Sequence, residues 1–71
     1  MLVSIVAVFD SADSHSVSET VYEPHSTTVE VGNGETPGDK VANFISERYW
    51  KIRKQRGIEP RLIAISHCVL P

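Results

Sequence analysis

The start of a helix is the clearest structural signal in the chain. It lies in residues 36–60, which read TPGDKVANFISERYWKIRKQRGIEP. Thr36 is a favourable N-cap, and Pro37 suits the first helical position because its missing N–H would have no partner there. Asp39 stands where a capping box normally carries Glu. This pattern predicts that a helix begins directly after Thr36.

The end of the same helix is equally well marked. Residues 40–56 contain neither Gly nor Pro. Gly57 then provides a left-handed C-cap, and Pro60 prevents the helix from continuing. Acidic residues open the stretch and basic residues close it, in agreement with the helix macrodipole.

Apolar residues recur along this helix at a spacing that places them on one side. At 100° per residue, four of them lie within about 80° of each other and form the expected core face: Val41, Ile45, Tyr49 and Ile52. Ala42 and Phe44 widen this stripe. The sequence therefore predicts an amphipathic helix that packs against a sheet.

Trp50 falls on the opposite, polar side of the helix, about 180° from Val41. Trp and Arg are the residue types most enriched in binding hot spots. We therefore expect a partner-binding surface of Trp50, Arg53 and Lys54, extended by Lys51, Arg48 and Arg56. The alternative is that Trp50 folds over the Lys and Arg stems or packs under the loop that follows the helix.

Two further segments are apolar enough to be central strands. Leu2–Phe9 is apolar on both faces apart from Ser4, and it lacks the preceding basic residue of a signal peptide. Arg61–Leu70 alternates Ile63, Ile65, His67 and Val69 with Leu62, Ala64, Ser66 and Cys68. We expect both strands in the middle of the sheet, parallel to each other.

The region between Phe9 and the helix is more polar. Val17–Glu23 alternates as a half-buried or edge strand does, and Thr27–Val31 is a β-branched strand that ends at Gly32-Asn33-Gly34. The sequence Glu23-Pro24-His25-Ser26 predicts a turn between them, because Pro24 has no N–H to donate to a ladder.

These elements predict one domain spanning residues 1–71, of the α+β class. The expected order is ββ(β)αβ, with one helix on one face of a three- or four-stranded antiparallel or mixed sheet. One helix leaves the other face uncovered, and we expect apolar residues there: Leu2, Val6, Val8, Leu62 and Ala64. This favours a homodimer by sheet stacking or a protein partner. Alternatively, Tyr22, the loop Ser11–Ser18 and the chain ends cover that face.

Charge is distributed unevenly along the chain. Residues 1–39 contain seven carboxylates and no Lys or Arg, whereas residues 40–71 contain all seven basic residues and two carboxylates. The formal charges of −7 and +5 give the net −2. We expect an acidic surface that includes Glu19, Glu23 and Glu30. The isoelectric point of about 5.8 lies well below the ~9 typical of a nucleic-acid-binding domain, so a protein partner ranks above nucleic acid.

Chemistry-bearing residues show no spacing that specifies a reaction. The histidines and Cys68 lack metal-site spacing, and His67 and Cys68 point to opposite faces of one strand. We expect Cys68 to be a small buried residue. Asp13-Ser14-His15 is a polar loop rather than a triad, and no P-loop lysine follows Gly34. The sequence predicts no enzyme, no cofactor, no metal and no membrane span.

The function expected from these residues is that of a small non-enzymatic, cytoplasmic protein that regulates or inhibits a larger macromolecule. In length and expected architecture the chain is similar to many small bacteriophage and prophage accessory proteins, although this likeness assigns no functional residue. Two alternatives stay open. One is a nucleic-acid-binding module that uses the basic helix, and the other is a structural or assembly protein that forms homo-oligomers, such as a dimer.

Overall fold

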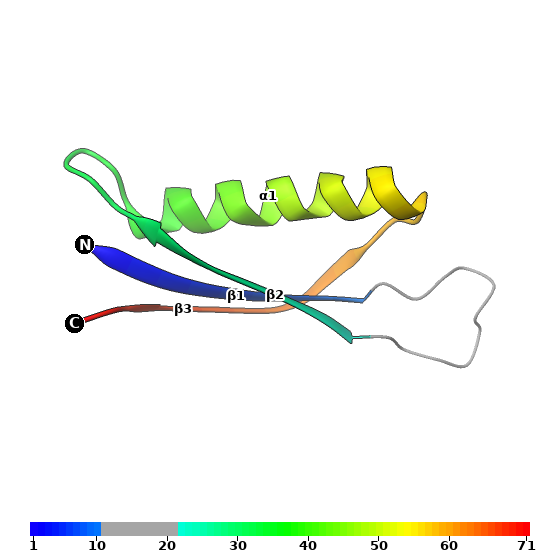
Figure 1. Cartoon of the computed structure of the whole chain (residues 1–71), viewed down its shortest axis with the longest axis horizontal. Helices are drawn as coiled ribbons and strands as arrows, with labels where there is room; N and C mark the ends of the chain where they lie inside the picture. The colour runs from blue at the N-terminus through cyan, green and yellow to red at the C-terminus, as the bar shows by residue number, and fades with distance from the viewer. Residues whose placement is uncertain (11–21) are drawn as a thin grey trace.

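The computed structural model describes residues 1–10 and 22–71 as an open three-stranded sheet with one helix packed against it. Its elements are β1 (Leu2–Asp10), β2 (Tyr22–Glu30), α1 (Pro37–Arg56) and β3 (Arg61–Val69). The strand order is β2-β1-β3, and β1 pairs antiparallel with both neighbours. The helix lies along one face of the sheet (Figure 1). The α+β class is therefore confirmed.

Strand β1 is the centre of the hydrophobic core. Its odd-numbered side chains Val3, Ile5, Ala7 and Phe9 are completely buried, whereas the even-numbered ones are only partly covered. The helix packs on the odd-numbered face. The burial of β1 thus follows the two-residue period of a strand that has a helix on one side only.

The helix contributes Phe44 and Ile52 to this core, and Val41, Ile45 and Tyr49 pack against it while staying partly exposed. The predicted stripe is thus the face that meets the sheet. Ala42 is exposed, so it does not widen the stripe as expected. It lies at the margin of the stripe, about 100° from Val41, where the helix surface turns toward solvent.

Both predicted helix caps are present. The Thr36 hydroxyl accepts a hydrogen bond of 3.2 Å from the Asp39 N–H. Gly57 has the left-handed φ of 67°, and its N–H donates to the Arg53 carbonyl at 2.9 Å. These local contacts satisfy backbone groups that a helix end otherwise leaves unpaired.

The turn predicted at Glu23-Pro24-His25-Ser26 is wrong, because β2 runs through these residues. The Val31 N–H donates to the Met1 carbonyl, and bonding residues alternate along an antiparallel strand, so the odd-numbered residues of β2 bond to β1. Pro24, opposite Val8, is even-numbered and faces away from β1. Pro24 therefore directs its ring nitrogen to the outer edge, where a strand tolerates proline. Residues 17–21 of the predicted strand Val17–Glu23 lie outside the described residues.

Because β2 is one strand rather than two, β3 also runs in the opposite direction to the one expected. Between β1 and β3 the chain reverses three times, at β2, at α1 and at β3, so β3 is antiparallel to β1. A strand on each side of a turn at Pro24 would have added a fourth reversal and produced the parallel arrangement that we expected. In the order β2-β1-β3, moreover, only β1 is central, and β3 is an edge strand.

A β-bulge shifts the register of β3 between Val8 and Phe9. Ala64 lies opposite Val8 but Leu62 lies opposite Phe9, so Ile63 is the extra residue. Leu62 consequently lies on the helix side of the sheet, and its expected place on the uncovered face with Ala64 is wrong. Cys68, opposite Ser4, is exposed rather than buried, because nothing in the described part of the chain covers that face.

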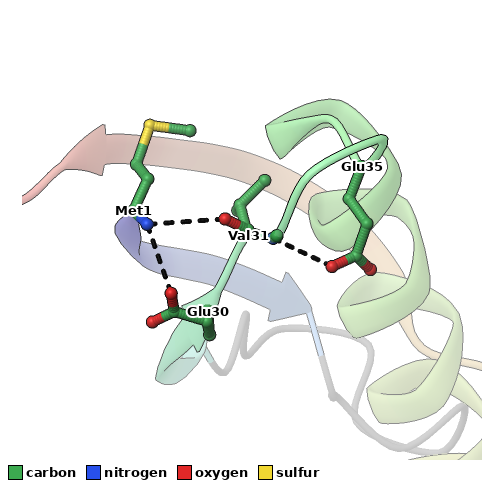
Figure 2. A network of polar contacts seen from close by, with 5 residues as sticks. Met1, Glu30, Val31 and Glu35 are labelled. Carbon is green, nitrogen blue, oxygen red and sulfur yellow. Dashed lines mark hydrogen bonds and ion pairs between the residues drawn. The ribbon is translucent and has the colours of Figure 1, made fainter.

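The connection from β2 to α1 is held by polar contacts (Figure 2). The Met1 amino group lies 3.2 Å from Glu30 Oε1 and 3.4 Å from the Val31 carbonyl oxygen. Glu35 accepts a hydrogen bond of 2.9 Å from the Gly32 N–H, and its other oxygen lies 2.6 Å from Lys40 Nζ. The hydrogen bond from Lys40, followed by that from Gly32, lowers the pKa of the Glu35 carboxyl.

Candidate partner-binding surface on the helix

Trp50 is the centre of the candidate surface. It lies on the outer side of α1, and 59% of its surface is exposed. The Arg53 guanidinium lies 5.3 Å from the centre of the Trp50 ring, and Tyr49 meets the ring edge-to-face with the centroids 5.6 Å apart. Arg53 therefore covers part of the indole, while most of it stays accessible to a partner.

Arg53 is held in place by a second contact. Its Nη1 donates to the Tyr49 hydroxyl at 3.2 Å, and this hydroxyl donates to Glu59 Oε1 at 3.4 Å. A guanidinium fixed between an aromatic face and a hydroxyl loses less conformational freedom on binding than a free side chain does. The arrangement presents Trp50 and Arg53 as one ordered aromatic and cationic unit, which we call the Trp50–Arg53 platform.

The six residues predicted for this surface divide into two groups. Trp50, Lys51, Arg53 and Lys54 are exposed on the helix, and among the described residues neither lysine takes part in an ion pair. Arg48 is half-buried, with its guanidinium 5.3 Å from the centre of the Phe44 ring. Arg56 reaches across to β2. The structure thus brings Arg53 onto Trp50, leaves Lys51 and Lys54 exposed on the same helix, and directs Arg48 and Arg56 toward the sheet.

The contact of Arg56 with β2 joins the end of the helix to the sheet. Its two terminal nitrogens bind the two oxygens of Glu23 at 2.5 and 2.6 Å. His25 Nε2 lies 3.2 Å from the same carboxylate, and the His25 ring meets Phe9 edge-to-face. Glu23 therefore serves an internal, bidentate ion pair rather than an open acidic surface.

The two described residues of the predicted acidic surface, Glu23 and Glu30, are not brought together. Glu23 lies on the helix side of β2, opposite Phe9, and Glu30 lies on the other face, opposite Leu2. They also stand near opposite ends of the strand. Glu19 lies outside the described residues.

Among the described residues there is no metal-ligand cluster, and the Gly32 N–H is already bonded. In residues 1–10 and 22–71, no three His, Cys, Asp or Glu side chains gather as a metal site would require; His15 lies beyond these ranges. In the loop Gly32-Asn33-Gly34, the Gly32 N–H is not free for an external anion, because it already binds the Glu35 carboxylate. The helix of the described chain is not apolar enough to span a membrane.

Sequence reasoning missed the two pairings that arrange this surface. Arg56 and Glu23 are 33 residues apart, and Tyr49 and Glu59 are 10 apart. For Arg56 and Glu23 the sequence signal was the opposite charge of a helix end and a strand start, together with the place of Arg56 about 60° from Val41 on the helix. It could be used only after the single strand through Pro24 was known.

Comparison with known proteins adds no relationship to this geometry. No protein-family model matches the chain, and neither the curated proteins nor the solved structures contain a significant match. The functional argument therefore depends on the surface itself.

Proposed function

We propose that this chain is a small non-enzymatic binding protein that regulates or inhibits a larger protein through the outer face of α1. The observation that carries the proposal is the Trp50–Arg53 platform, in which an indole that is 59% exposed lies beside an ordered guanidinium. Burying a large aromatic side chain is among the strongest contributions a single residue makes to association.

The neighbouring charges indicate the kind of partner. Lys51 and Lys54 flank the Trp50–Arg53 platform and have no ion-pair partner in the described part of the chain. Their charges favour an acidic protein surface that has an apolar pocket for the indole, because such a surface steers association and seats the ring at once. A cytoplasmic setting, as for a phage-type accessory protein, is part of this proposal, since Cys68 is an exposed free thiol.

The proposal is tested by Trp50→Ala in an affinity pull-down from lysate, followed by titration of the recovered protein. We expect the variant to bind at least about 30-fold more weakly, as truncation of a hot-spot residue does. Tyr22→Ala is the matched control because Tyr22 is also an exposed aromatic residue, 65% accessible, and lies on β2. Circular dichroism and urea unfolding check that both variants keep the fold.

The outcomes separate the proposed class from its alternatives. Equal loss of binding in both variants, or loss of cooperative unfolding in Trp50→Ala alone, contradicts the assignment of this surface. Recovery of nuclease-sensitive material, with an affinity that falls linearly on a log–log plot against salt, would instead identify a nucleic-acid-binding module. Recovery of the chain alone would point to an assembly protein.

A further inference from the structure

Strand β3 is an uncovered edge of the sheet. All nine of its residues are exposed, although its inner edge pairs with β1. An edge strand that is long and apolar presents a row of unpaired backbone groups, and natural proteins normally protect such an edge. Arg61 and the bulge at Ile63 protect only the start of β3. Residues 64–70 contain no charged side chain and no proline, so most of the edge lacks the usual protection.

The ladder shows which backbone groups point outward. The Leu70 N–H donates to the Leu2 carbonyl at 2.9 Å, so the even-numbered residues of β3 bond to β1. Ile65, His67 and Val69 therefore direct their N–H and C=O groups to the open edge. The opposite edge of the sheet differs, because Pro24 offers no N–H there.

The helix side of β3 is also incompletely covered. The helix packs on β1, and the β3 side chains on the same face remain 38% (Leu62), 41% (Ile65) and 55% (Val69) exposed. The unpaired backbone edge of β3 and its exposed apolar side chains are thus accessible to the same binding partner. An occupant that pairs with the edge must also cover these side chains.

We propose that the occupant is a second copy of this chain, with β3 paired antiparallel to β3 in one continuous six-stranded sheet. A two-fold axis perpendicular to the sheet places both helices on the same face. If each helix lies over its own β1, three strand spacings separate the helix axes, roughly 14 Å. Directly packed helices are 8 to 10 Å apart. The remaining channel is about one side chain wide, and the apolar side chains of both β3 strands fill it.

The charges fit a second copy as well. The two helices run antiparallel in this arrangement, so their basic ends, which include Lys51, Arg53 and Lys54, lie at opposite ends of the dimer. The uncharged parts of the two β3 edges, residues 62–69, meet without bringing like charges opposite each other. This interface is independent of the Trp50–Arg53 platform, which lies on the side of the helix that faces away from the sheet.

The test measures the mass of the full chain by analytical ultracentrifugation from micromolar to millimolar concentration. We expect a reversible dimer for the wild type and for Trp50→Ala. His67→Pro removes an outward N–H from each copy without removing a bond to β1, and we expect it to weaken the dimer about tenfold or more. Thr28→Pro is the control, since Thr28 is an exposed residue with an outward N–H on the opposite edge.

A second pair of variants distinguishes a weakened dimer from a chain that has lost its fold. His67→Lys keeps the backbone donor but places two like charges in the paired edge, and Thr28→Lys is its control. We expect only the position-67 variants to dissociate. A wild type that stays monomeric at millimolar concentration overturns the proposal. So does a dimer that resists both substitutions at His67, since the copies would then meet through another face, such as stacked sheets.

Discussion

Glu35 shows how a single side chain organises the approach to the helix. Its carboxylate binds the Gly32 N–H and Lys40 Nζ, and these contacts lower its pKa below the ordinary value of 4.5. A carboxyl whose pKa is lowered by folding stabilises the folded state at pH values above its unfolded pKa. That stabilisation is lost as the pH falls through the folded-state pKa.

We therefore expect Glu35→Gln to unfold at lower urea concentration than the wild type at pH 7. The difference should narrow when the pH is lowered past 4.5, because the wild-type carboxyl then becomes neutral as well. Urea unfolding at a series of pH values measures this. Glu47→Gln, a helix-surface variant of an exposed residue, is the control. A difference that is constant from pH 7 into acid would show that the ionised carboxylate contributes nothing.

At the scale of the helix, replacing two glycines by alanine should change the stability of the fold in opposite directions. Gly57 has a φ of 67°, and nothing lies within 4 Å of the position that a Cβ atom would take, so Gly57→Ala costs only backbone strain, about 1 to 2 kcal/mol. Gly38 has no left-handed φ, and a Cβ there would meet only Thr36 Oγ1 at 3.9 Å. Gly38→Ala should stabilise the fold by up to about 1 kcal/mol. Thermal and urea unfolding of both variants check the two signs, and a stabilising Gly57→Ala would contradict the C-cap.

The helix could be predicted from the sequence because its signals are local. Thr36, Pro37 and Gly57 act on neighbouring backbone groups, and a spacing of 3.6 residues is enough to separate Ile52 from Trp50. Strand β2 could not be predicted in the same way. Pro24 favours a turn locally, and only the pairing that places its nitrogen on an outer edge makes it acceptable in a strand.

The candidate surface was predictable to the same extent. Helical periodicity alone places Trp50 on the outer side, where the structure has it 59% exposed. The same spacing places Arg48 about 20° and Arg56 about 60° from Val41, so it also turns these two basic residues toward the sheet. It does not tell which groups they meet there. The Glu23 partner of Arg56 is set only when the helix has packed on the sheet in one direction, whereas the contact of Arg48 with the Phe44 ring joins residues four apart on the same helix.

At the scale of the whole molecule, the two faces of β1 should differ sharply in their tolerance of substitution. Ile5 is completely buried beneath the helix, and Ile5→Ala should cost about 2 to 5 kcal/mol. A domain this small has a total stability of only about 5 kcal/mol, so the variant should be largely unfolded at 37 °C. Val6→Ala, the neighbour on the open face and only half-buried, should cost much less. Urea unfolding compares them, and equal losses would mean that the open face is covered in solution.

The lengths of helix and strand also affect how the chain assembles. Twenty helical residues span about 30 Å, and nine strand residues span about the same distance. The β1–β2 ladder joins residues that are close in sequence, whereas the hydrogen bond from Leu70 to Leu2 joins residues 68 positions apart. The helix carries the chain back to the Asp10 end of β1, so that only the short connection after Arg56 separates it from the start of β3. The helix therefore not only covers the core but, through its length, also sets where β3 begins, with Arg61 opposite Asp10.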